Sequence, residues 1–155
     1  MEINSEEDCI KAGLLYGYPY ILKKRRLAYD GNGNFVVNSE GQITEGYNKL
    51  GGSELYAERW VSYSKEIAMM IVKSESGVVA YPVVETIQES NICHIVIAPA
   101  QISRAAEVEA NYIACNAVSS LSGYGIFGVE LFLLIDDSIL LNEIAPRYAV
   151  VYVYI

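Results

Sequence analysis

Two acidic residues near the end of the chain, Glu130 and Glu143, have a spacing that could bring their carboxylates together. They stand in "GIFGVELFLLIDDSILLNEIAP", where apolar runs flank Asp136 and Asp137 as in two strands joined by a tight turn. If these two aspartates form the turn, the resulting strand pairing places Glu130 directly opposite Glu143. Antiparallel partners have Cβ atoms about 4.5–5.5 Å apart. One carboxylate must then hold a proton, or a cation must lie between the two.

A cation shared by two carboxylates suits Mg²⁺, which takes one or two carboxylates and fills its other positions with phosphate and water. The pair therefore predicts a magnesium site that works on phosphates. The alternative is two solvent-facing acids at the rim of a sheet, because a one-residue error in the turn removes the pairing. In a regular strand Asn142 points to the other face, so a role for it requires a local twist or a backbone contact.

A basic run at residues 23–26, followed by the loop "AYDGNGN", is the second group with chemical potential. In a strand Lys23 and Arg25 share one face, so the run can point two cations into a cleft. The glycines let backbone N–H groups approach phosphate oxygens closely. The alternative is an ordinary hairpin turn. The loop matches neither the P-loop nor the GxGxxG pattern.

Helical and strand patterns predict the elements that must position these residues. Alternating and continuous apolar runs separated by glycine-rich turns indicate a mixed α+β protein with largely antiparallel sheets. The predicted helices are residues 5–17, 43–52 and 103–121, the last with a small-residue face of Ala106, Ala110, Ile113, Ala114 and Ala117. The predicted strands are residues 18–26, 35–37, 54–61, 65–74, 78–88 and 94–100, followed by the hairpin 125–146.

Composition excludes several classes of protein. A hydrophobic share of 52% in 155 residues favours a compact globular protein. A net charge of −8 disfavours a nucleic-acid or anionic-membrane binder. Cys9, Cys93 and Cys115 have no disulfide or zinc spacing and are expected to be reduced, as in the cytoplasm. No signal peptide and no apolar run of membrane-spanning length is visible.

Several ordered motifs together resemble a known family. They are "GYPYILKKRRLAYDGNGNFVV", "YAERWV", "KEIAMMIV", "YPVVETIQESNICHIVIAPA", "GIFGVELFLL" and "LLNEIAPR", and they run from about residue 5 to Arg147. They resemble the ATP-grasp region of fungal-type phosphoribosylaminoimidazole carboxylase and of its bacterial counterpart, 5-(carboxyamino)imidazole ribonucleotide synthetase. The resemblance implies two lobes whose largely antiparallel sheets enclose a nucleotide cleft. The smaller lobe would be residues 1–57, the larger lobe 58–147, and residues 148–155 a divergent tail.

The resemblance also implies the activity. The family carboxylates aminoimidazole ribonucleotide in purine biosynthesis, using ATP and bicarbonate, with Mg²⁺ at the phosphates. The expected partners are thus small molecules, without nucleic acid or membrane, in a cytoplasmic protein that forms a homodimer if it behaves as the family does.

The matching motifs also imply the site residues. Lys23 is expected to contact the ATP phosphates, and Glu66 to hold the ribose hydroxyls. Arg147 is expected to meet a phosphate, with a surface salt bridge as the alternative. Gln88 stands where bacterial members tend to have histidine near the nucleotide. Glu130 and Glu143 are expected to ligate Mg²⁺, with Asn142 beside them. The mobile loop over the phosphates would be Ala28, Tyr29, Asp30, Gly31, Asn32, Gly33 and Asn34, and the adenine would be framed by Glu58, Arg59, Trp60 and Val61.

Two departures from the family leave other functions open. The family has a further domain before this region, and it continues after "NEIAPR" with Pro-His-Asn-Ser-Gly-His where this chain has "YAVVYVYI". The nucleotide half of the site is therefore expected to be intact and the acceptor half incomplete. The alternatives are a non-catalytic remnant that at most binds Mg-ATP, and an ATP-grasp ligase with another acceptor.

Overall fold

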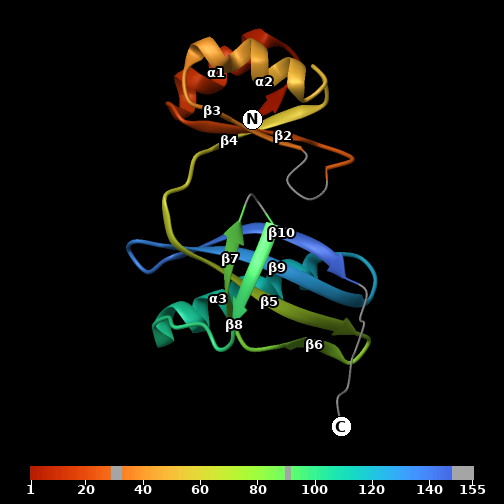
Figure 1. Cartoon of the computed structure of the whole chain (residues 1–155). Helices are drawn as coiled ribbons and strands as arrows, with labels where there is room; N and C mark the ends of the chain where they lie inside the picture. The colour runs from red at the N-terminus through yellow and green to blue at the C-terminus, as the bar shows by residue number, and fades with distance from the viewer. Residues whose placement is uncertain (29–32, 90–91, 148–155) are drawn as a thin grey trace. The chain divides into compact units, whose positions relative to one another are not determined.

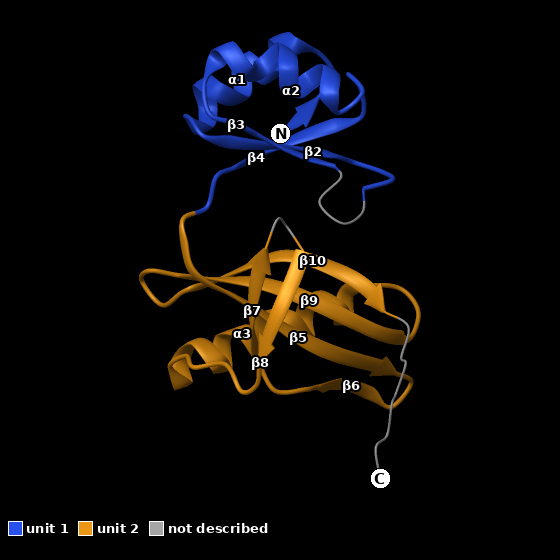
Figure 2. Cartoon of the chain, viewed as in Figure 1, with its two compact units in different colours: residues 1–61 blue, residues 62–155 orange. Residues whose placement is uncertain are grey.

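Two compact units make up the computed structural model, residues 1–61 and residues 62–155 (Figure 2). The structure describes residues 1–28, 33–89 and 92–147. Because the division follows Val61, the expected adenine frame of residues 58–61 belongs wholly to the first unit.

The first unit is a four-stranded antiparallel sheet with helices on one face (Figure 1). The strand order is β1-β4-β2-β3. Its elements are β1 (Glu2–Ile3), α1 (Glu6–Tyr16), β2 (Tyr20–Lys24), β3 (Asn34–Val37), the 3₁₀ helix η1 (Glu40–Gln42), α2 (Ile43–Lys49) and β4 (Leu55–Arg59).

Local signals at both ends of α1 explain why the helix forms where it does. The Ser5 hydroxyl accepts a hydrogen bond from the Asp8 amide at 3.2 Å, which satisfies one of the free N–H groups of the first turn. Gly17 ends the helix with φ of +75°, a conformation that glycine adopts without strain. The helix predicted at residues 5–17 is therefore confirmed, whereas the strand predicted at 18–26 is shorter and ends at Lys24.

The second unit is a six-stranded antiparallel sheet with α3 on one face. The order is β10-β9-β5-β7-β8, and β6 pairs with β5 beyond this path. Its elements are β5 (Tyr63–Ser74), β6 (Gly77–Ala80), β7 (Val84–Glu89), β8 (Ile92–Ile97), α3 (Arg104–Ser120), β9 (Gly125–Leu134) and β10 (Ile139–Arg147).

The strand predicted at residues 78–88 is in fact two strands that pair with different parts of β5. β6 pairs with the end of β5, whereas β7 pairs with its beginning, with Glu66 opposite Thr86. The break includes Pro82, which has no N–H to donate to a sheet ladder. Across the described residues, no helix has the length and apolar character needed to cross a membrane.

Alternation along β9 gives the second sheet two different faces. Val129 and Leu131 are buried in the same core as the helix residues Ala110 and Ala114. The predicted small-residue face of α3 is confirmed except at Ala117, because the buried residue near the end of the helix is Val118. Glu130, between them, is half-buried on the opposite face. One face is thus a core, and the other is free to carry polar groups.

We predict that Ser103→Ala destabilises the second unit by about 1 kcal/mol. The Ser103 hydroxyl accepts from the Ala106 amide at the start of α3 and donates to the Asp137 carboxylate, 2.5 Å away in the β9–β10 turn. Urea unfolding would measure the loss, with Ser122→Ala as the control, since Ser122 is exposed and makes no hydrogen bond within the described residues. Equal unfolding free energies for the two variants would contradict this role.

Candidate active site

The β9–β10 hairpin places Glu130 directly opposite Glu143, so the predicted pairing is confirmed. The turn proposed to produce it is wrong. The Leu134 amide donates to the Ser138 carbonyl at 2.9 Å, and Ile139 pairs with Leu133. The loop therefore has one residue more than the two aspartates.

A β-bulge in β10 compensates for the one-residue shift in strand register that the longer loop causes. Leu141 pairs with Leu131, the register shifts, and Glu143 then pairs with Glu130. Asn142 is the extra residue between these pairs. Bulges bend a strand and re-aim its side chains, so the regular-strand argument that turned Asn142 away from the site does not apply here.

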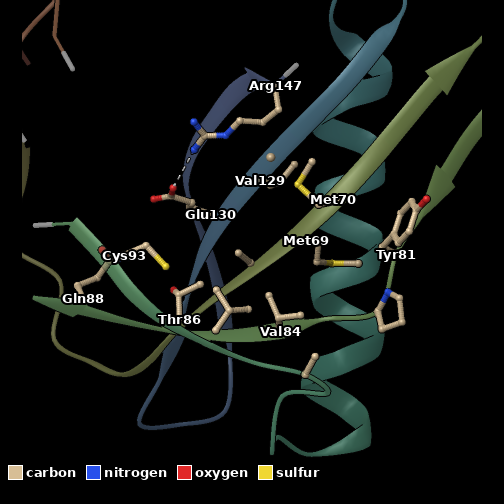
Figure 3. A pocket seen from close by; sticks show the side chains of 15 residues that line it. Met69, Met70, Tyr81, Val84, Thr86, Gln88, Cys93, Val129, Glu130 and Arg147 are labelled. Atoms are coloured by element: carbon tan, nitrogen blue, oxygen red, sulfur yellow. Dashed lines mark ion pairs between the residues drawn. The ribbon is translucent and has the colours of Figure 1, made fainter. Parts of the chain in front are cut away.

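Electrostatics at Glu130 match two carboxylates held close together. Burial is the largest cause that raises the pKa of Glu130, and the neighbouring charges of Glu143 and Glu66 raise it further. Arg147 acts in the opposite direction, with its Nη2 atom 3.7 Å from Glu130 Oε1 (Figure 3). The free protein thus carries more negative charge at this point than one arginine balances.

Gly128, which the sequence reasoning did not single out, makes room for Arg147. A Cβ atom at Gly128 would lie 3.2 Å from Arg147 Nε and 3.5 Å from its Cγ. The arginine side chain therefore lies close over the backbone of β9 on its way to Glu130. A glycine inside the apolar run "FGVELF" was the available signal, because such a glycine often marks a close approach.

A pocket of about 450 Å³ opens on this face of the second unit (Figure 3). Gln88 lines it at a second register irregularity, between Ile87 and Gln88. Its wall is mostly apolar with a few polar groups, the usual character of a small-molecule site. The lining residues are Ala68, Met69, Met70, Tyr81, Pro82, Val84, Thr86, Gln88, Cys93, Val96, Ala98, Gly128, Val129, Glu130 and Arg147.

Glu66 belongs to the same open face as the carboxylate pair. Glu66 pairs with Phe132, and Ala68, two residues further along β5 and so on the same face, pairs with Glu130. Three expected site acids, Glu66, Glu130 and Glu143, are therefore gathered by neighbouring strands.

The carboxylate pair fits Mg²⁺ bound together with phosphate. Within residues 1–28, 33–89 and 92–147, no three His, Cys, Asp or Glu side chains are placed to hold a metal by themselves. Mg²⁺ needs only one or two carboxylates when phosphate and water complete its shell. Burial, and after it the negative charge of Glu143, raise the pKa of Glu130, and a bound cation would offset both effects.

In the first unit, Lys23 is paired and largely buried. Its side chain is 16% exposed, and its Nζ lies 2.6 Å from Glu58 Oε2. Arg25 pairs with Glu2, also at 2.6 Å. Carboxylates of the same unit thus compensate two of the four cations of the basic run, and a phosphate that binds Lys23 must compete with Glu58.

Ala28 and Gly33 form the neck of the expected phosphate loop, where the two sides of the loop come close together. A Cβ atom on Gly33 would lie 2.5 Å from the Ala28 Cβ and 3.2 Å from the Ala28 Cα. Asn34 begins β3. The remaining expected loop residues, Tyr29, Asp30, Gly31 and Asn32, lie outside the described residues.

The residues expected to frame adenine form the end of β4 and the two positions after it. Arg59 places its guanidinium 5.8 Å from the centre of the Tyr16 ring. Trp60 is exposed and Val61 is half-buried. An exposed indole and a half-buried aliphatic side chain are compatible with a flat apolar ligand.

Comparisons with known proteins identify the family. The family model described as "ATP-grasp domain" matches residues 1–149. The chain belongs to the ATP-grasp family. It is 53% identical over 145 residues to the phosphoribosylaminoimidazole carboxylase of Candida glabrata, a match that covers 93% of this chain and 25% of that protein. It is 37% identical over 132 residues to the N5-carboxyaminoimidazole ribonucleotide synthase of Synechococcus elongatus, covering 84% and 33% of the two chains.

Solved structures agree with this assignment. The carboxyaminoimidazole ribonucleotide synthase of Aspergillus clavatus complexed with ATP matches with a TM-score of 0.91 and 45% identity, over 96% of this chain and 40% of that one. The same enzyme with ADP and 5-aminoimidazole ribonucleotide gives a TM-score of 0.88 and 43% identity, over 96% and 39%. The resemblance and the ATP-grasp fold inferred from the motifs are therefore confirmed, although this chain spans only about a quarter of the length of the Candida glabrata carboxylase.

The raised pKa of Glu130 predicts a pH-dependent cost to stability. A carboxyl whose pKa is higher in the folded state than its ordinary value of 4.5 binds its proton more tightly when folded. The free energy of unfolding then falls as pH rises from the ordinary pKa of the carboxyl to its higher pKa in the folded state, and it stays lowered above that pH. We expect Glu130→Gln to stabilise the free chain by about 0.5 kcal/mol at about pH 7, and the gain to vanish below about pH 4.

Urea unfolding at the two pH values would measure this gain. Glu109→Gln on the exposed side of α3 is the matched control and should change little at either pH. A loss of stability in Glu130→Gln at neutral pH would contradict the repulsion inferred here.

Proposed function

We propose that this chain binds Mg-ATP as the nucleotide-binding part of an enzyme that carboxylates aminoimidazole ribonucleotide in purine biosynthesis. The observation that carries the proposal is the Glu130–Glu143 pair, two carboxylates directly opposite on the open face of an ATP-grasp sheet. The names of the relatives support the acceptor and the reaction.

Glu130 and Glu143 are the proposed ligands of Mg²⁺, with Asn142 at the bulge beside them. When bound, Mg²⁺ would neutralise charge on the ATP phosphates. Lys23 would contact the phosphates, and Glu66 would accept hydrogen bonds from the ribose hydroxyls. Residues 58–61 would frame the adenine, Gln88 would lie near the nucleotide, and residues 28–34 would exclude water from the phosphates.

The chemistry proposed for the complete enzyme has two steps. A bicarbonate oxygen attacks the γ-phosphorus of ATP, ADP leaves, and carboxyphosphate forms. The amine of aminoimidazole ribonucleotide then attacks the carboxyl carbon, the amine loses a proton, and phosphate leaves. No covalent bond to the protein is needed, so positioning and charge stabilisation would supply the catalysis.

Arg147 is proposed to stabilise negative charge during these steps. Its guanidinium already lies against Glu130 at the edge of the pocket, where a bound anion could exchange for that weak contact of 3.7 Å. The pocket volume, about 450 Å³, suits a small substrate. We propose this pocket as part of the substrate site, next to the nucleotide near which Gln88 would lie.

Because the chain spans about a quarter of the Candida glabrata carboxylase, Mg-ATP binding is the function proposed for the chain alone. Complete carboxylation is proposed for the longer protein that contains such a region. A cytoplasmic location is part of the proposal, supported by three free cysteines. The homodimer stays a prediction.

We predict that Lys23→Ala and Glu143→Ala each weaken ATP binding by about tenfold or more, because each removes a charged partner of the phosphates or of their metal. Calorimetric titration of the purified chain with ATP, with and without Mg²⁺, would measure this. Lys11→Ala is the matched control for Lys23, since Lys11 is 61% exposed and pairs only with Asp8 among the described residues. Glu109→Ala serves the same purpose for Glu143. Unchanged affinity in both test variants would refute the proposed site.

A second prediction concerns the loop neck. Gly33→Ala should weaken ATP binding without unfolding the chain, because the new methyl group would collide with Ala28 and reshape the loop. Gly41→Ala is the control, since a Cβ there would meet only Ser39 Oγ at 3.9 Å. Equal ATP affinity for the two variants, measured by the same titration, would show that the neck has no role in binding.

A further inference from the structure

An irregularity at the start of β5 brings Tyr63 to the face that carries Glu66. Tyr63 pairs with Leu134 and Lys65 pairs with Leu133, so Ser64 is an extra residue in the ladder. The Ser64 hydroxyl donates to the Leu133 carbonyl at 3.0 Å and is 3.3 Å from the Leu134 carbonyl, which anchors this bulge to β9. Residues three apart on a regular strand point to opposite faces. The bulge removes that separation.

Tyr63 holds Glu66 through one short hydrogen bond. Its hydroxyl donates to Glu66 Oε1 at 2.5 Å. Its ring stacks on Phe132 with centroids 4.5 Å apart and an interplanar angle of 10°. Phe132 is itself the cross-strand partner of Glu66. The three side chains form one cluster. The stack on Phe132 holds the Tyr63 ring in place, and the hydroxyl of that ring holds the Glu66 carboxylate.

The second oxygen of the Glu66 carboxylate remains free to accept. No other donor to Glu66 is found in the described part of the chain. Burial raises the pKa of Tyr63 to about 12, and the hydrogen bond to Glu66 acts in the same direction. At neutral pH the phenol is therefore a donor to Glu66.

We propose that Tyr63 is a positioning residue that holds the Glu66 carboxylate ready for the ribose hydroxyls and so sets the preference for a ribonucleotide. This inference rests on the proposed function, in which Glu66 receives the ribose of ATP. A free glutamate side chain loses rotamer freedom when a ligand orders it, whereas a carboxylate that is already held loses less. Tyr63 acts through Glu66 and need not touch the nucleotide.

Tyr63→Phe tests the proposal because it removes the hydroxyl and keeps the ring on Phe132. With Mg²⁺ present, ATP should bind about five- to tenfold more weakly to the variant. Binding of 2′,3′-dideoxyATP, which lacks both hydroxyls, should change by no more than about twofold. Calorimetry with both nucleotides measures the two effects on the same protein.

A double-mutant cycle shows whether Tyr63 acts through Glu66. In the Glu66→Ala background, Tyr63→Phe should cause no further loss of ATP affinity. Tyr112→Phe is the matched control, because Tyr112 is exposed on α3 and none of the described residues bonds its hydroxyl. It should leave both affinities unchanged. Thermal unfolding of each variant confirms that the fold is retained.

Equal weakening of ATP and dideoxyATP by Tyr63→Phe, or full additivity with Glu66→Ala, would overturn the inference and leave the proposed function standing. The same holds if ATP affinity does not change. Failure of the wild-type chain to bind Mg-ATP at all would instead contradict the proposed function, and this inference with it.

Discussion

The placement of Glu130 directly opposite Glu143 is the constraint around which the polar face of the second unit is organised. Like charges directly opposite in an antiparallel pair cost about 0.2–1 kcal/mol. The opposite face supplies far more than that, because burial of each large aliphatic side chain stabilises the fold by about 1.5–3 kcal/mol. The core between α3 and the sheet can therefore hold the pair together. A cation that binds between the two carboxylates therefore relieves a repulsion that the folded protein already tolerates.

Irregularities in the sheet, more than its regular ladders, place the side chains of the proposed site. The bulge at Asn142 returns Glu143 to its position opposite Glu130, and the bulge at Ser64 brings Tyr63 to Glu66. A third irregularity, before Gln88, lies at the pocket. Bulges are common beside active sites because they re-aim single side chains within an otherwise rigid sheet. A rigid core face and an adjustable polar face are thus combined in one layer.

Sequence reasoning could reach the features that local patterns determine. Helix caps and apolar periodicity predicted α1 and the buried alanine face of α3. The Glu130–Glu143 pairing was predicted through two errors that cancel, a loop one residue too short and an unforeseen bulge. Loop length and bulges depend on how the neighbouring strand is hydrogen-bonded, which a single segment does not encode. The same holds for the Lys23–Glu58 ion pair, whose partners lie on different strands of the first sheet.

The most direct test of the central claim is to locate the metal of metal-ATP on the protein. Mn²⁺ can replace Mg²⁺ in such complexes, and its unpaired electrons broaden nearby amide signals in an NMR spectrum of the ¹⁵N-labelled chain. With substoichiometric Mn-ATP, we expect the strongest broadening at residues 128–131 and 142–144 and at the residues of β5 paired with them, and loss of that broadening in Glu143→Ala. Broadening confined to other segments, or unchanged by that substitution, would contradict the assignment of the carboxylate pair as the metal site.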